Sequence, residues 1–200
     1  MEKEKPKAEP GIADLYAQQG YILQPGLIDP GFCTYLTRYL LLCAETGRAE
    51  ADGAVANAFS MYGDPAFDTL LNVLAFDVSA HVGHEVVPTY SFARLYSEGS
   101  ELVKHVDRPA CEHSISLHLG GTATAWALRL LDHHESEVSV MQEPGDALAY
   151  QGMQLVHWRD RLDVGWQAQL FLHWVEVGGT YASQRFDGRS SLGLPPILRP

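Results

Sequence analysis

The chain has 200 residues, of which 46% are hydrophobic, and its formal net charge at pH 7 is -11. This length predicts a single domain with enough apolar side chains for a sizeable core. The acidic net charge argues against nucleic acid or an anionic membrane surface as the main partner.

The cysteines and the N-terminal residues indicate the cellular compartment in which we expect the protein. Cys33, Cys43 and Cys111 are an odd set without a CxxC spacing, so we expect free thiols in a reducing compartment, the cytoplasm. The first residues, MEKEKPKAEPG, are charged and lack the apolar segment of a secretory signal. No apolar run is long enough to span a bilayer, so we expect no membrane partner.

The first half of the chain carries helical signals. Residues 20–29 predict a short strand and a turn, after which Asp29-Pro30 opens a helix with apolar residues at helical spacing. Residues 49–65 are interpreted as a loop, and residues 65–82 as a second helix. The buried positions expected on this second helix are Phe67, Leu70, Leu71, Val73, Leu74 and Val78.

After Pro88 the pattern changes to short runs rich in β-branched and aromatic residues. Turn residues separate these runs, and EPGD at residues 143–146 is a clear turn signal. This spacing is typical of an antiparallel sandwich or barrel. The expected strands are TYSFARLYS, HSISLHL, TAWALRLLD, SEVSVM, DALAYQ, LVHWR and AQLFLHWVEV.

Helices followed by strands predict an α+β fold that is mainly β. The size of the β-rich part fits a double-stranded β-helix, a cupin-like jelly roll, buttressed by the N-terminal helices. We expect a flexible tail over residues 1–10 and one domain over residues 11–200. Within the domain, the helical buttress covers about 28–85 and the β-core about 90–176.

His105-Val106-Asp107 is the main candidate for a metal site. Residues i and i+2 of a strand point to the same face, so His105 and Asp107 can converge on one point. Two His and one carboxylate suit ferrous iron and leave open coordination positions. His157, in a later strand, is the candidate third ligand. The alternative is a strand end with a solvated Asp and a packed His.

The motif has a wider context. Tyr96-x-x-Gly99, then His105-Val106-Asp107-x-Pro109 and the distal His157, resembles the iron- and 2-oxoglutarate-dependent dioxygenases, especially the prolyl-hydroxylase branch. The resemblance covers about residues 90–176. It implies that His105, Asp107 and His157 bind Fe(II), and that Tyr96 helps to hold the cosubstrate 2-oxoglutarate. A core aromatic residue is the alternative role for Tyr96.

One position departs from the family pattern. Where the family usually has a basic residue for the far carboxylate of 2-oxoglutarate, this chain has Gln167, which can hydrogen-bond but carries no charge. Burying a dicarboxylate without a cation is costly. Either Arg159, Arg161 or Arg94 substitutes, in that order of preference, or the cosubstrate is not 2-oxoglutarate. Strand alternation predicts that Arg159 shares the inner face of His157, that Arg161 does so if the strand continues, and that Arg94 shares the face of Tyr96. Each arginine could instead lie at the surface, paired with an acidic residue.

Other polar residues were assigned weaker roles. Arg94, Arg108 and Trp126 are candidate substrate contacts. His113 and His118 are an odd number of residues apart on one strand, so at most one of them lines the barrel. His173 is interpreted as structural.

The resemblance implies a hydroxylase that acts with dioxygen on a free amino acid, a peptidyl residue or a natural-product intermediate. An alternative is a mononuclear non-haem iron oxygenase that does not use 2-oxoglutarate. A third hypothesis is a non-catalytic jelly-roll binding module, which requires His157 to lie far from His105 and Asp107. The sequence makes no prediction of the oligomeric state.

Overall fold

The structure is a computed structural model that describes residues 10–123 and 126–194. The tail predicted for residues 1–10 therefore lies, apart from Pro10, outside the described residues. The helices are α1 (Ile12–Gln19), α2 (Pro30–Glu45), α3 (Pro65–Val73), α4 (Ala75–Val82) and the 3-10 helices η1 (Pro109–Cys111) and η2 (Ala182–Gly188). The strands are β1 (Tyr21–Gln24), β2 (Glu50–Ala51), β3 (Ala58–Tyr62), β4 (Val86–Ser97), β5 (Leu102–His105), β6 (His113–Gly121), β7 (Leu128–Leu131), β8 (Glu137–Val140), β9 (Ala147–Tyr150), β10 (His157–Arg159) and β11 (Trp166–Glu176).

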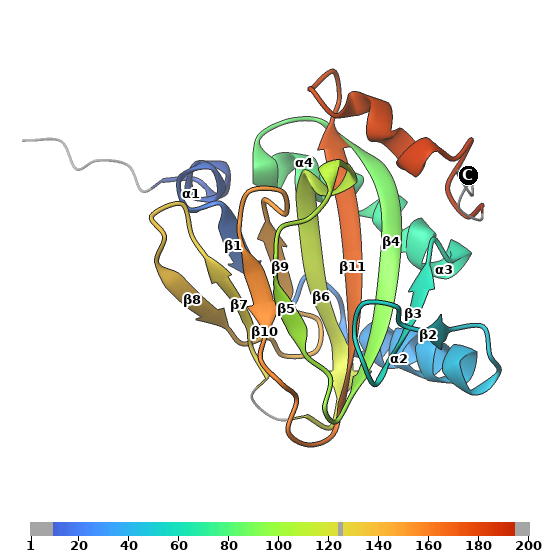
Figure 1. Cartoon of the computed structure of the whole chain (residues 1–200). Helices are drawn as coiled ribbons and strands as arrows, with labels where there is room; N and C mark the ends of the chain where they lie inside the picture. Colours follow the sequence, from blue (N-terminus) through green and yellow to red (C-terminus); the bar gives the residue numbers. More distant parts are fainter. Residues whose placement is uncertain (1–9, 124–125, 195–200) are drawn as a thin grey trace, which may run out of the picture.

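The described strands form two antiparallel sheets that face each other (Figure 1). The larger sheet has seven strands in the order β1-β9-β6-β11-β4-β3-β2, and the smaller has four in the order β5-β10-β7-β8. Strands that follow each other in the chain alternate between the sheets at β4–β5–β6 and at β9–β10–β11. This is the double-stranded β-helix that the sequence predicts.

Helices α2, α3 and α4 cover the outer face of the large sheet (Figure 1). Leu36 of α2 and Leu71 of α3 join one apolar cluster with Leu117 of β6 and Leu170 of β11. Because strand side chains alternate, the neighbours of these leucines on β6 and β11 point the other way, between the sheets. The helices therefore complete the core on one face and leave the inner face for polar residues.

Two of the helices begin at an Asp-Pro pair, of which the sequence predicted the first. The Asp29 carboxylate accepts hydrogen bonds from the backbone N–H groups of Gly31 (2.8 Å) and Phe32 (3.1 Å), and Pro30 is the first helical residue of α2. Asp64-Pro65 opens α3 in the same way. An aspartate cap satisfies N–H groups that have no partner inside the helix, and proline has no N–H to satisfy.

Three sequence predictions in the helical part are wrong. Residues 49–65 are not a loop, because β2 and β3 form there and β3 pairs with β4. Residues 65–82 form two helices rather than one, since Leu74 ends α3 and begins α4. Val73 is 65% exposed, because α3 ends at this residue. Helix α1, whose Tyr16 is buried, was not predicted.

In the part of the chain that the structure describes, no helix has the length and hydrophobicity that crossing a bilayer requires.

Candidate metal centre and its pocket

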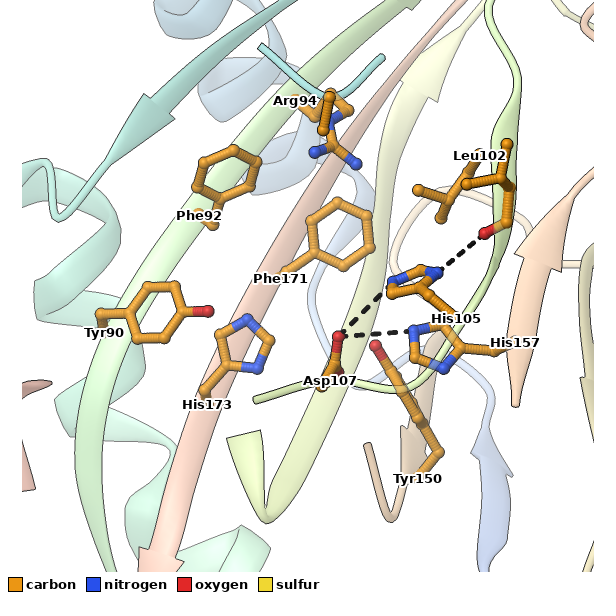
Figure 2. A pocket seen from close by; sticks show the side chains of 12 residues that line it. Tyr90, Phe92, Arg94, Leu102, His105, Asp107, Tyr150, His157, Phe171 and His173 are labelled. Atoms are coloured by element: carbon orange, nitrogen blue, oxygen red, sulfur yellow. Dashed lines mark hydrogen bonds and ion pairs between the residues drawn. The ribbon is translucent and has the colours of Figure 1, made fainter. Parts of the chain in front are cut away.

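The two strands that carry the candidate histidines lie side by side in the small sheet. His105 ends β5, His157 begins β10, and the two residues are direct partners in the antiparallel register. Asp107 follows β5, and its backbone N–H donates to the carbonyl of Gly152 at 2.9 Å. The pairing of these strands brings the side chains of His105, Asp107 and His157 together (Figure 2).

The three side chains have the geometry of a facial ligand set. Nε2 of His105 and Nε2 of His157 each lie 3.6 Å from Oδ1 of Asp107. One ligand atom from each residue lies within 4.8 Å of the other two. The convergence of His157 with His105 and Asp107 contradicts what the binding-module hypothesis requires.

Backbone carbonyls select the tautomer of both histidines. Nδ1 of His105 lies 2.9 Å from the carbonyl oxygen of Val103, and Nδ1 of His157 lies 2.9 Å from that of Leu155. A carbonyl can only accept, so each Nδ1 carries the proton and each neutral ring keeps a lone pair on Nε2. Metal-binding histidines are commonly oriented through the other ring nitrogen in this way. The donor set and its orientation fit a divalent iron ion.

Electrostatics favour the ligating protonation states of Asp107 and His157. Burial raises the pKa of Asp107, but the nearby histidines His105, His157 and His173 outweigh burial and hold this pKa below its ordinary value. Interaction with Asp107 in turn raises the pKa of His105. Burial lowers the pKa of His157, against the opposing effect of Asp107. An ionised carboxylate beside a neutral imidazole is therefore the favoured state of this pair at neutral pH.

A glycine makes room for the carboxylate. A Cβ atom at Gly152 would overlap Asp107 Oδ2 and would lie 2.7 Å from both the Cys111 carbonyl oxygen and Ser114 Oγ. No side chain therefore fits at this position without displacing Asp107. The sequence analysis did not single out Gly152, because its neighbours here come from distant parts of the chain.

The three residues open onto a cavity of about 380 Å³ between the sheets (Figure 2). This size is within the usual range for small-molecule sites. Aromatic and aliphatic side chains dominate its walls, and Arg94 supplies a cation. The residues that line the cavity besides the triad are Ala54, Tyr90, Phe92, Arg94, Leu102, Val103, Tyr150, Phe171 and His173.

His173 lies closer to the metal centre than its predicted structural role suggests. Its Nδ1 is 2.8 Å from Ser114 Oγ, and one of its ring nitrogens could share a metal site with Asp107 and Cys111. Its pocket neighbour Phe171 has the same strand parity on β11. That parity, counted from Gln167, could have identified His173 from the sequence.

Arg159 is a buried cation that has no acidic partner in the described part of the chain. Its side chain is on the inner face with His157, as predicted, and it is 1% exposed. Nη1 donates to the carbonyl of Trp126 at 2.8 Å, whereas Nε has no partner among the described residues. Burial lowers the pKa of Arg159 to about 10. A buried guanidinium without a counter-ion is costly, so this site favours an anion.

Arg94 and Arg161 differ from Arg159. Arg94 faces inward, as its parity predicts, but its Nε already donates to Asp52 Oδ2 at 2.7 Å and its Nη1 to Tyr96 Oη at 3.0 Å. Arg161 is exposed, and its predicted inward position is wrong because β10 ends at Arg159. Of these three arginines, Arg159 is therefore the buried one whose charge no acidic residue balances among the described residues.

The cosubstrate candidates Gln167 and Tyr96 and the substrate candidate Trp126 lie away from the cavity lining. Gln167 is buried and lines a separate hollow with Trp126. The Trp126 indole N–H donates to the carbonyl of Asp160 at 2.7 Å, and its ring packs edge-on against Tyr96, with centroids 4.8 Å apart. The buried Tyr96 lies beside Arg94 rather than in the cavity lining.

Arg108, the remaining candidate, forms a two-pronged ion pair with Asp187 of η2, with distances of 2.6 and 2.7 Å. An anionic substrate group would have to compete with Asp187 for this arginine. The prediction for His113 and His118 is confirmed, because His118 lies beside Gln169 on the inner face whereas His113 contacts Tyr16 of α1.

No protein-family model matches the chain, and no curated protein matches it either. Solved structures do resemble it. A prolyl-4-hydroxylase from Pseudomonas putida is 13% identical, covers 81% of this chain and 96% of its own, and has a TM-score of 0.66. The α-ketoglutarate-dependent epimerase SnoN of nogalamycin biosynthesis is 15% identical, covers 94% of both chains, and has a TM-score of 0.69.

A third similar structure is HygX from Streptomyces hygroscopicus with nickel and 2-oxoglutarate bound. It is 14% identical, covers 81% of this chain and 85% of its own, and has a TM-score of 0.62. These likenesses establish the fold, which is the jelly roll of the 2-oxoglutarate- and iron-dependent oxygenases, and confirm the predicted architecture. The function must be argued from the site.

Proposed function

We propose that this protein is an Fe(II)- and 2-oxoglutarate-dependent dioxygenase that hydroxylates an amino acid, a peptidyl residue or a natural-product intermediate. The observation that carries the proposal is the convergence of His105, Asp107 and His157, with ligand atoms within 4.8 Å of one another. Iron bound there would supply the redox chemistry that couples decarboxylation of the cosubstrate to oxidation of the substrate by dioxygen.

Arg159 supports 2-oxoglutarate as the cosubstrate. The cosubstrate is a dicarboxylate, and the charge of Arg159 has no acidic partner among the described residues. A charge-assisted hydrogen bond from this guanidinium would offset the burial of one carboxylate. Gln167 and Tyr96 are proposed to add uncharged hydrogen bonds. The similar structure of HygX contains nickel and 2-oxoglutarate, which agrees with a metal and this cosubstrate in the same fold.

The remaining walls of the cavity suit an apolar substrate group. Phe92 and Phe171 form part of the lining, together with Tyr90 and Leu102. We expect these side chains to exclude water and to hold a carbon atom of the substrate near the metal. Arg108 is proposed to meet an anionic group of the substrate at the rim, where Asp187 now pairs with it.

The proposal extends to the domain and its compartment. Residues 11–200 are proposed to form one catalytic domain, since one apolar cluster joins the helices to the large sheet and two others join the large sheet to the small sheet. The cytoplasm is proposed as the location, because Cys33, Cys43 and Cys111 are buried free thiols.

Anaerobic spectroscopy tests the proposal. Fe(II) is added to metal-free protein, and 2-oxoglutarate is titrated while the visible spectrum is recorded. A weak charge-transfer band that is lost in His105→Ala, and formation of succinate after air is admitted, are the expected results. His81→Ala is the matched control, because His81 lies on α4 outside the cavity lining.

The other outcomes contradict the proposal in distinct ways. Iron binding without the band would favour an oxygenase that does not use 2-oxoglutarate. The reason would be that Gln167 carries no charge at the position where a basic residue usually binds this cosubstrate. Failure of the wild-type protein to bind Fe(II) would exclude both oxygenases and favour a binding module.

A further inference from the structure

A second cluster of potential metal ligands lies on the helix side of the large sheet. It consists of Glu112, His113 and Glu176. Glu112 follows η1, His113 begins β6, and Glu176 ends β11. Because β6 and β11 are antiparallel neighbours, with His113 opposite Trp174, the start of one strand lies beside the end of the other. The register therefore holds the three side chains together.

The geometry of the cluster is compact. One ligand atom from each residue lies within 4.8 Å of the other two, and His113 Nε2 is 3.5 Å from Glu176 Oε1. The backbone N–H of Glu176 donates to Glu112 Oε2 at 2.9 Å, which holds the second carboxylate in place. This contact engages one oxygen of Glu112 and leaves the other for a ligand.

His113 is the unsatisfied member of the cluster. The residue is 7% exposed, and its Nε2 is buried without a hydrogen-bond partner among the described residues. Its Nδ1 is 2.9 Å from the hydroxyl oxygen of Tyr16. If Nδ1–H donates to Tyr16, the lone pair of Nε2 faces the carboxylate of Glu176. A buried nitrogen in this position destabilises the protein unless a partner occupies the space.

We propose that Glu112, His113 and Glu176 bind a divalent metal cation of the zinc class, at a site separate from the His105–Asp107–His157 centre. One imidazole nitrogen and two carboxylate oxygens are ligands that zinc accepts at the distances usual for proteins. Tyr16 acts as a positioning residue, because it orients the ring through Nδ1. The Glu176 side chain is 32% exposed, so a cation can reach the site from solvent.

Strand β6 separates this site from the first centre. Ser114, the next residue, points to the opposite face, where its Oγ lies 2.8 Å from Nδ1 of His173. Ser114 Oγ also lies 3.5 Å from Asp107 Oδ2, so the first centre is on the inner side of β6 and the second is on its outer side. A cation at the second site would bind the segment after η1 to the end of β11, and it would support the strands that carry Ser114 and His173.

Metal stoichiometry tests the proposal independently of any oxygenase activity. Metal-free full-length protein is dialysed against Zn²⁺, and bound zinc is measured by elemental analysis. The expected result is two zinc ions per wild-type chain and one per chain of the His105→Ala/His157→Ala variant. Adding Glu176→Gln to this variant should weaken the remaining binding at least about 10-fold.

Two matched controls accompany the test. Glu85→Gln changes an exposed acid on the loop before β4, and His118→Gln changes a buried histidine on the inner face of β6. Both should leave the second ion bound. Loss of all zinc from the His105→Ala/His157→Ala variant, or equal binding by Glu176→Gln and Glu85→Gln, would overturn the proposal.

Circular dichroism accompanies each measurement to establish that every variant is folded. The single variant Glu176→Gln, in which the first centre is intact, provides a second comparison. The expected change is from two zinc ions to one. An unchanged count of two would exclude this site.

Discussion

His105 and His157 are direct cross-strand partners, and their ring centroids lie 4.3 Å apart. This pairing is possible because β5 and β10 are neighbours in the small sheet, although the two residues are far apart in the chain. Each ring is also oriented by a backbone carbonyl two residues earlier, that of Val103 or Leu155. The sheet thus sets both the distance between the rings and the nitrogen that each presents to Asp107.

Gly152→Ala should weaken metal binding without changing any ligand. The added Cβ would overlap Asp107 Oδ2 and crowd Ser114 Oγ, so Asp107 must move. We expect Fe(II) affinity to fall by about 10-fold or more, as for other changes around metal ligands. Overpacking of this kind also lowers the free energy of unfolding by about 1–3 kcal/mol. Calorimetric titration with Fe(II) under anaerobic conditions measures the first effect.

Gly53→Ala is the matched control for this change. No atom lies within 4 Å of a Cβ built at Gly53, so metal affinity should stay at the wild-type value. Equal affinities for the two alanine variants would show that Asp107 tolerates the crowding and would contradict the prediction.

Arg159→Met should reduce the affinity for 2-oxoglutarate while leaving the affinity for Fe(II) unchanged. Hydrogen bonds to charged groups contribute about 1.5–3 kcal/mol, which corresponds to about a 10- to 100-fold weaker complex. The guanidinium has no acidic partner among the described residues, so its removal should lower the free energy of unfolding little. Anaerobic titration of the Fe(II) protein measures both affinities.

Arg161→Gln is the control, because Arg161 is exposed beyond the end of β10. If Arg159→Met binds 2-oxoglutarate as well as the wild type does, then Arg94→Met is the next variant to test. If only Arg94→Met loses affinity for 2-oxoglutarate, then the carboxylate binds at Arg94 on the cavity wall.

The free energy of unfolding should fall as the pH decreases from about 6.5 to about 4. Burial, aided by the charge of Arg159, lowers the pKa of His118 to about 4, and burial lowers that of His173 to about 4. In this pH window the unfolded chain binds protons at these histidines and the folded protein does not, so protonation favours unfolding. Each such histidine contributes a slope of up to about 1.4 kcal/mol per pH unit.

Urea unfolding of His118→Gln at several pH values tests whether His118 causes the free energy of unfolding to fall as the pH decreases. The variant should show a shallower loss of unfolding free energy between pH 6.5 and pH 4, whereas the exposed His134→Gln should follow the wild type. A wild-type slope in His118→Gln would mean that His118 titrates alike in the folded and unfolded states.

Asp187→Asn should loosen η2 without unfolding the jelly roll. Asp187 accepts two hydrogen bonds from Arg108 and one from Tyr62, and its backbone is left-handed, with φ of 55°. Asparagine tolerates this conformation but loses the ion pair. Hydrogen exchange of residues 182–188 should accelerate several-fold, and exchange of β11 should not. The control is Asp163→Asn, a substitution at an exposed aspartate. Faster exchange of residues 182–188 in this control would contradict a local effect of Asp187.

Local patterns accounted for the elements that carry the site. Alternation in the runs after Pro88 predicted most strands of the β-core, and the i, i+2 spacing of His105 and Asp107 predicted their shared face. Parity also placed Arg159 and Arg94 inward and His113 and His118 on opposite faces. These features depend on residues close together in the chain, where the backbone geometry is set by the strand itself.

Other features depended on partners that the sequence does not reveal. The pairing of β3 with β4 turned a predicted loop into a strand, and the end of β10 left Arg161 in solvent. The unpartnered charge of Arg159, the close approach of Gly152 to Asp107 and the position of His173 at the cavity all involve residues that are distant in the chain.

The amino-acid sequence by itself determined the periodicity of the strands, the helix start at Asp29, and the chemistry of the candidate ligands. Each of these follows from interactions within a few residues of the backbone. Only the tertiary structure decided which strands became neighbours, and thus that His157 meets His105 and that His113 meets Glu176. Strand pairing depends on the burial of side chains from the whole chain, so no local pattern contains it.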